Sequence, residues 1–371
     1  PTWGLLLNHV SYVGHGTDGD PWLPSVRLFS REWNEAWEPI IAHMADSLSD
    51  MAHGLPESIL PLSQPELLNQ QGIAAYQAGE FDAAIGFFRM AAELAPDCAD
   101  YPSNHGSALQ AQGRHADAET LFRQALATQP DHASTYFNLG NLFKTQGRLT
   151  EAETAYRQAL DLDPGRETAW NNLGTMLLDS GRHDEACEAF EHLLALNPTD
   201  ALAHGNLALG LKSRGQTAEA ESHLRQAIAL APDFAEAHNN LGNLLTSQQR
   251  YEEAIGAFLH AMDIRPDYFE AVNNLGRAYA DDFRFDEAIQ CFEALLAVQP
   301  DNSRTLNGLG SVLTQQGRLA DAAKLFMKAL AVRFDDYDAH CNLGQVALQM
   351  GDLGNGWDGY AQRFQRENRP V

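Results

Sequence analysis

The sequence predicts an all-α fold, an α-solenoid built from stacked helix–turn–helix units. The first observation is a unit that recurs every 34 residues without insertion from residue 65 onward. The second is that each unit holds two stretches with apolar residues at helical spacing, i, i+3, i+4 and i+7. A constant period of this length is what a stack of similar units requires, because each unit buries its apolar face against its neighbours.

The recurring unit has a small set of fixed positions, which we number so that its recurring Pro stands at position 32. Repeats 1 to 9 then begin at residues 65, 99, 133, 167, 201, 235, 269, 303 and 337, and the ninth is incomplete. Position 8 is Gly except for Ala208, position 20 is small, and position 24 is large and apolar. We expect the small residues to let the two helices approach closely and the large residue to fill the space between them.

Gly marks the end of the first helix of each repeat, and Pro marks the end of the second. Gly stands at position 15 in seven repeats and is expected to end the first helix in a left-handed conformation. Pro at position 32 is expected to end the second helix, because it cannot continue one. Gln249 and Phe283 replace the Gly, so we predict different or strained turns there. Phe334 replaces the Pro, which predicts a looser joint before the ninth repeat.

The whole pattern resembles the tetratricopeptide repeat family. It consists of Leu–Gly at positions 7 and 8, Ala at 20, Phe or Tyr at 24, Ala at 27 and Pro at 32, and it extends from Pro65 to about Phe364. The resemblance implies a right-handed superhelix, with the first helix of each repeat on the concave side and the second on the convex side. It also implies a function in binding a protein or peptide.

The limits of the repeats suggest the domain organisation. We expect an N-terminal segment over residues 1–64, eight repeats over 65–336, and a partial ninth repeat with a capping helix over 337–371. The first repeat needs a cap over its apolar face. Trp33 and Trp37 stand one helical turn apart, so we expect residues 1–64 to form a small irregular cap with short helices. An independent binding element, or the remnant of a larger domain, is the alternative.

Composition limits the partners and the compartment. The net charge is −25, from 50 acidic and 25 basic residues, which argues against nucleic acid, whose phosphates require clustered Lys and Arg. No apolar stretch approaches the length of a membrane span. The four cysteines share no C-x-x-C spacing, which favours free thiols in a reducing compartment and a cytoplasmic protein. The stretch GLLLNHV lacks a basic flank, so we expect no secretion signal, and the first residue, Pro1, leaves open a longer native protein.

Catalytic and metal sites are not expected. The chain has no GxGxxG, P-loop, HExxH or GxSxG motif, so we expect neither a cofactor nor an active site. Four residues with metal-ligating side chains gather in a Gly-rich stretch that we expect to be a solvated loop: His9, His15, Asp18 and Asp20. Three histidines stand at position 4, where repeat 4 has Trp170, and are expected to be packing groups: His204, His238 and His340.

Asparagine recurs at position 6 in seven of the nine repeats: Asn104, Asn138, Asn172, Asn206, Asn240, Asn274 and Asn342. Asn lowers helix propensity by roughly half a kcal/mol relative to Ala, so its repetition needs a reason. One reason is a structural bond to the neighbouring repeat. The other is a row of amides along the groove, because an amide both donates and accepts and can therefore pair with any peptide main chain.

The row resembles the asparagine ladder in the superhelix of O-GlcNAc transferases, which grips extended protein substrates by their main chain. The resemblance implies that an extended, polar or basic segment binds in the concave groove. The implied peptide-binding residues are the seven asparagines at position 6 together with three at position 5: Asn171, Asn239 and Asn273.

Two functions therefore stay open. The first is a non-catalytic interaction scaffold. The second follows from four residues of the ninth repeat that resemble the G-W-x-x-Y-x-x-R signature with which bacterial arrays of this family lead into a glycosyltransferase: Gly356, Trp357, Tyr360 and Arg363. The chain would then be the substrate-recruiting region of a larger enzyme whose catalytic domain lies outside it. Self-association through the exposed ends of the stack also stays open.

Overall fold

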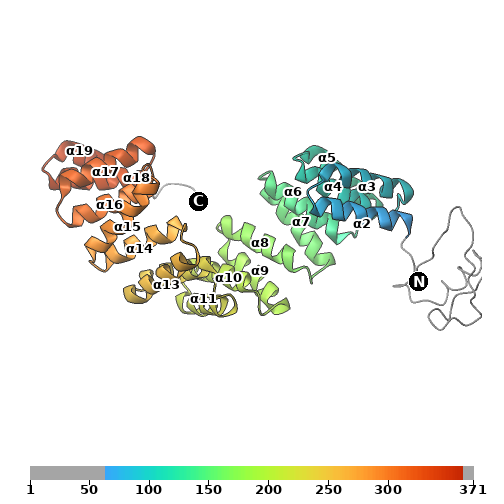
Figure 1. Ribbon diagram of the computed structural model, residues 1–371, viewed down its shortest axis with the longest axis horizontal. Coiled ribbons are helices and arrows are strands. Elements are labelled where there is room, and N and C mark those ends of the chain that lie inside the picture. The colour runs from blue at the N-terminus through green and yellow to red at the C-terminus, as the bar shows by residue number, and fades with distance from the viewer. Residues whose placement is uncertain (1–62, 362–371) are drawn as a thin grey trace, which may run out of the picture.

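The computed structural model describes residues 63–361 as a continuous array of helices (Figure 1). Within these residues there are 18 helices, labelled α2 to α19, and no strand. The all-α solenoid is thereby confirmed. The expected N-terminal cap, the four metal-ligand residue types between His9 and Asp20, and Arg363 of the ninth repeat lie outside the described residues.

Each repeat contributes two consecutive helices. The first helices of the nine repeats are α2 (Gln64–Gln77), α4 (Asp100–Ala111), α6 (Ala133–Thr145), α8 (Glu167–Asp179), α10 (Ala201–Ser213), α12 (Ala235–Ser247), α14 (Phe269–Asp281), α16 (Ser303–Gln315) and α18 (Tyr337–Gln349). The second helices are α3 (Phe81–Leu94), α5 (His115–Thr128), α7 (Leu149–Leu162), α9 (His183–Leu196), α11 (Thr217–Leu230), α13 (Tyr251–Ile264), α15 (Phe285–Val298), α17 (Leu319–Val332) and α19 (Leu353–Tyr360).

The core of each repeat is the contact between position 8 and position 24. At Gly242, an added Cβ would lie 2.6 Å from the ring of Phe258, which is fully buried. The same close approach recurs in repeats 1 to 4, 7 and 8, which also pair Gly with Phe or Tyr at these positions. Repeat 5 has a methyl group at Ala208 and compensates with the smaller Leu224, and both are buried. A small residue at position 8 thus leaves room for the large side chain at position 24, and a larger residue at position 8 goes with a smaller one at position 24. The predicted roles of the two positions are confirmed.

The turns inside the repeats have the predicted left-handed residue. The seven glycines at position 15 have φ between 73° and 89°. Gln249 and Phe283 adopt φ of 61° and 60° at the same position. In this left-handed conformation the Cβ atom lies too close to the following carbonyl oxygen, which destabilises the turn. The prediction of strain at these two turns is therefore confirmed.

Where position 4 is Trp or His, its ring contacts the main-chain carbonyl oxygen at position 32 of the preceding repeat. The ring N–H of Trp170 donates to the carbonyl oxygen of Pro164, at 2.9 Å. Nε2 of His340 lies 2.9 Å from the carbonyl oxygen of Phe334, the corresponding distance in the ninth repeat. The joint before the ninth repeat thus keeps the contact that Trp170, His204 and His238 make in their joints, and the looser joint expected from Phe334 stays a prediction.

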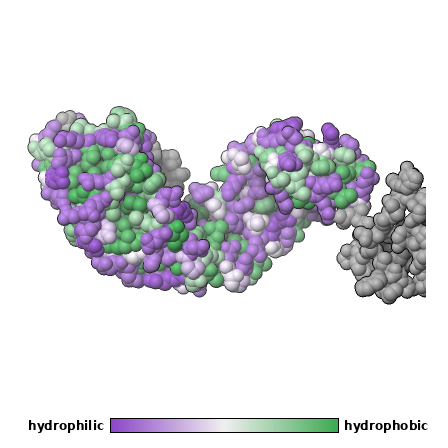
Figure 2. Space-filling model, viewed as in Figure 1, coloured by the Kyte–Doolittle hydropathy of each residue, from purple (hydrophilic) through white to green (hydrophobic). Residues whose placement is uncertain are grey.

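The stack curves because its two sides are spaced differently. First helices of neighbouring repeats contact one another, such as α10 with α12 and α12 with α14, whereas the second helices lie farther apart. The first helices therefore form the inner, concave side of an open arc and the second helices its outer side (Figure 1). Figure 2 shows a wide hollow between the arm of α2 to α8 and the arm of α14 to α19. Between residues 63 and 361, no helix is long and apolar enough to cross a membrane.

Candidate functional site

Six of the seven asparagines at position 6 connect their repeat to the one before it. In five joints the side-chain amide Nδ2 donates to the residue at position 5 of the preceding repeat. These bonds are Asn104 to Asn69 (2.9 Å), Asn138 to Ser103 (3.1 Å), Asn206 to Asn171 (3.4 Å), Asn274 to Asn239 (3.0 Å) and Asn342 to Asn307 (3.1 Å). One of the two reasons considered for the asparagine row, a bond to the neighbouring repeat, is therefore present.

Two joints depart from this pattern for reasons visible at position 5. Before Asn172 that position is Phe137, which offers no acceptor, and the amide donates instead to Oδ1 of Asn141 at 2.9 Å. Before Asn240 that position is Gly205, which has no side chain. Within residues 63–361, the side chain of Asn240 consequently has no hydrogen-bond partner, although it is half-buried on the inner side.

The ten expected binding residues differ in accessibility. Asn239, Asn273 and Asn274 are at most 3% exposed, so a ligand could not reach them without a change in the structure. Nδ2 of Asn273 and Oδ1 of Asn274 are buried without a hydrogen-bond partner. The other seven asparagines are half-buried and line the inner side: Asn104, Asn138, Asn171, Asn172, Asn206, Asn240 and Asn342.

Charged residues of both signs also lie on first helices. Lys144, Lys212 and Arg277 form no ion pair within 4.0 Å among the described residues, unlike most other basic residues there. Partial desolvation lowers the pKa of Lys212, and the positive charge of Arg277 lowers it further. The charge of Arg277 on α14 therefore acts on Lys212 on α10, two repeats away. The sequence could not reveal this influence, because it arises from the curvature of the stack.

The outer side carries a row of ion pairs that the sequence analysis did not single out. In repeats 3, 4 and 6 the Arg at position 16 bridges a Glu at position 19 of its own repeat and a Glu at position 21 of the preceding repeat. Arg148 thus pairs with Glu119 (2.7 Å) and Glu151 (2.5 Å), and Arg250 pairs with Glu221 and Glu253 (both 2.7 Å). The signal available in the sequence was the Arg that often follows the turn Gly.

The histidines at position 4 are engaged in packing contacts. Nε2 of His204 lies 3.1 Å from the carbonyl oxygen of Pro198, and its Nδ1 lies 2.8 Å from Nδ1 of His223. The two imidazole rings are stacked, with centroids 5.1 Å apart. Across residues 63–361, no group of three or more His, Cys, Asp or Glu side chains is arranged to hold a metal ion.

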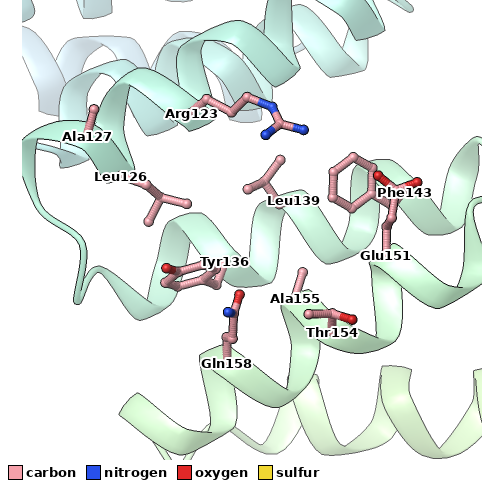
Figure 3. A pocket seen from close by; sticks show the side chains of 10 residues that line it. All are labelled: Arg123, Leu126, Ala127, Tyr136, Leu139, Phe143, Glu151, Thr154, Ala155 and Gln158. Carbon is pink, nitrogen blue, oxygen red and sulfur yellow. The ribbon is translucent and has the colours of Figure 1, made fainter.

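A cavity of about 460 Å³ lies on the outer side between repeats 2 and 3 (Figure 3). Figure 3 shows Leu126 from α5, Tyr136 and Leu139 from α6, and Ala155 and Gln158 from α7 around the opening. The lining is mainly apolar. The cavity itself arises because successive second helices lie apart from each other. This cavity is a second candidate site, separate from the asparagine row.

Comparisons with solved structures show the same architecture. A tetratricopeptide repeat protein from Parabacteroides merdae matches with a TM-score of 0.57 at 18% identity, covering 63% of this chain and 92% of that one. The Cut9–Hcn1 hetero-tetramer of the APC/C matches with a TM-score of 0.54 at 19% identity, covering 84% of this chain and 60% of that one. PilW, a type IV pilus biogenesis factor, matches with a TM-score of 0.50 at 23% identity, covering 55% and 94%. At these identities the likeness concerns the fold alone.

Family models identify the repeat from sequence. A general tetratricopeptide repeat model matches residues 273–339. The tetratricopeptide model described as the cilia and flagella-associated protein 70 C-terminal domain matches residues 44–267. No curated protein matches the chain. Because the second model spans more than half of the sequence, the chain belongs to the tetratricopeptide repeat family that this model describes.

Proposed function

We propose that this protein is a non-catalytic, cytoplasmic interaction scaffold that binds an extended polypeptide segment along its concave side. The half-buried asparagines of the first helices would contact the main chain of that segment. An Asn side chain has two N–H donors and a carbonyl oxygen with two lone pairs. The bond to the preceding repeat uses one N–H, so each amide retains groups that a peptide main chain can satisfy.

Asn240 is the observation that supports this proposal most directly. It has the helix-propensity disadvantage of every Asn, yet Gly205 leaves it without the inter-repeat bond that the other asparagines form. A structural role in joining repeats therefore does not account for it. An uncommitted amide on the concave side is instead suited to a donor and acceptor pair from a ligand.

The charges of the concave side bear on the composition of the ligand. Lys144, Lys212 and Arg277 lie on first helices without an ion pair within 4.0 Å among residues 63–361, and Asp179 ends the first helix of repeat 4. A segment with a polar composition and charges of both signs complements this surface better than a purely basic one. The alternative of a recruiting region for a larger glycosyltransferase stays a prediction, since Arg363 of its signature lies outside the described residues.

The test compares asparagines that differ in their structural role. A pull-down from native extract, quantified by mass spectrometry, is made with the parent protein, Asn240→Ala and the outer-side control Gln226→Ala. Asn240→Ala should lose partners while its free energy of unfolding stays equal or rises by up to about half a kcal/mol, because Ala is the better helix former. Gln226→Ala, which removes an exposed amide from α11, should retain the partners.

Two variants that keep all their partners would contradict binding on the concave side. The concave side would not be the binding surface if Asn240→Ala and the combined variant with Ala at residues 138, 172, 206 and 240 both keep every partner while remaining folded. The asparagine row would then serve only to join the repeats.

A further inference from the structure

Phe283 combines backbone strain with exposure. It stands at position 15 with φ of 60°, where seven repeats have Gly. The Cβ of an L-residue destabilises this conformation, and buried packing does not compensate, because Phe283 is 78% exposed. Its ring lies edge-on to that of Phe285, with the two ring centroids 6.1 Å apart and the ring planes at 80°. The turn thus holds an aromatic ring in solvent at a cost in stability.

The ring borders an open hollow of about 610 Å³ at the edge where the turns of repeats 6 to 8 meet. Tyr251, the first residue of α13, and Phe285, the first residue of α15, supply two further aromatic side chains. The polar lining comes from Asp281, the last residue of α14, and Gln315, the last residue of α16. Helix α13 lies low in the arc, and α14 and α15 follow above it at the start of the arm that ends in α19 (Figure 1).

The charge at this hollow is negative. Partial desolvation raises the pKa of the Asp281 carboxyl, and the positive charge of Arg277 opposes that rise. Arg277 nevertheless forms no ion pair with Asp281 within 4.0 Å. Arg284 is already committed, since it pairs with Glu252 at 3.3 Å and with Glu287 at 3.0 Å. A cation brought to the hollow would therefore meet a carboxylate that lacks a close partner.

We propose that this hollow binds a basic side chain, Lys or Arg, of a polypeptide partner. The cation would lie against the rings of Tyr251, Phe283 and Phe285 and take Asp281 as its counter-ion. Aromatic faces attract ammonium and guanidinium groups through the ring quadrupole, and a partly desolvated carboxylate adds a charge-assisted hydrogen bond. The site lies at the turn edge, apart from the asparagine row, so it does not depend on the proposed peptide groove.

The test measures the dissociation constants of labelled hexa-arginine and hexa-lysine peptides by fluorescence anisotropy at about 0.15 M salt, where distant charges are largely screened. Phe283→Gly and Asp281→Asn should each weaken binding by about two- to fivefold or more. Two matched controls should change it by less than about twofold. Gln249→Gly removes the same backbone strain without removing a ring, and Asp161→Asn removes one carboxylate from the exposed surface of α7.

Melting temperatures keep the test independent of folding. Phe283→Gly should melt at a higher temperature than the parent, as should Gln249→Gly, because Gly accepts the left-handed conformation. A lower melting temperature for Phe283→Gly alone would mean that the ring is structural and would overturn the proposal. So would unchanged binding in Phe283→Gly, or an equal loss in Asp161→Asn, which would indicate diffuse attraction to an acidic protein.

Discussion

The inner and outer sides of the stack hold the same joints by different chemistry. On the inner side, neutral amides bond at 2.9 to 3.4 Å, and at the joint of Asn274 with Asn239 both side chains are at most 3% exposed. On the outer side, ion pairs are more open to solvent, with Arg250 37% and Glu253 52% exposed. The inner bonds should therefore depend on geometry and be insensitive to salt, whereas the outer pairs should be screened by it.

Two adjacent joints differ in the bonds that hold them. Between repeats 4 and 5, Cys187 and Gln216 stand where other repeats have the Glu and Arg of the outer pair, but Arg214 pairs with Asp184 at 2.9 Å and the inner bond of Asn206 is present. Between repeats 5 and 6 the inner bond of Asn240 is missing, but the outer pairs of Arg250 are present. Of the two rows, the joint of Asn240 thus has the outer one alone, whereas its neighbour has both an amide bond and an ion pair.

Acid should have the largest effect on this comparison, because it acts on the whole outer row at once. Hydrogen bonds from Arg148, Arg182 and Arg250 hold the pKa of several carboxyls below the ordinary value of 4.5: Glu119, Glu151, Glu153, Glu185 and Glu253. Their contribution to stability is complete above that value and is lost as the pH falls through the lowered pKa values. We expect the melting temperature to fall steeply below about pH 4.5. A melting temperature constant from pH 7 to pH 3 would contradict this.

A single change on the inner side should come next. Asn274→Ala removes the donor to the buried Oδ1 of Asn239, so we expect a loss of about 1 to 2 kcal/mol in the free energy of unfolding. Asn206→Ala, whose bond is longer and half-buried, should lose less. Urea titrations at low and high salt measure both. Because amides carry no charge, a loss for Asn274→Ala that disappears at high salt would show that the inner row is not what stabilises the joint.

A single change on the outer side should have the smallest effect. Arg250→Gln breaks the pairs with Glu221 and Glu253 at a joint that has no inner bond, so the melting temperature should fall slightly. Arg182→Gln, at a joint where Asn172 still bonds Asn141, should lower it less. Both differences should shrink in about 1 M salt, where the screening length is about 3 Å. Equal effects of the two variants would show that an inner bond does not support its joint when the outer pairs are lost.

Most of the fold was predictable because it is local and repeated. The turn glycines, the small residue at position 8 and the large residue at position 24 each specify a local geometry, and nine copies leave little ambiguity. The strain at Gln249 and Phe283 was also predictable, because only Gly accepts the left-handed conformation without penalty. The contact of His340 with the carbonyl oxygen of Phe334 was not predictable in this way, because it joins a side chain of one repeat to the main chain before it.

The candidate site was predictable only in outline. The row of asparagines was visible, but the acceptor of each amide lies in another repeat, 35 residues away in most joints. Which amide lacks a partner depended on Gly205, a residue unremarked in the sequence. The burial of Asn239, Asn273 and Asn274 likewise depended on how closely neighbouring first helices pack.

The sequence by itself determined the helix pairs, their turns and the family, because these follow from spacing within one unit. The tertiary structure decided which side chains meet between units. It placed the charge of Arg277 where it lowers the pKa of Lys212, left Asn240 without a hydrogen-bond partner within residues 63–361, and assembled Tyr251, Asp281 and Phe283 around one hollow. Such contacts depend on the small rotation between successive repeats, which accumulates along the stack and which a 34-residue period does not specify.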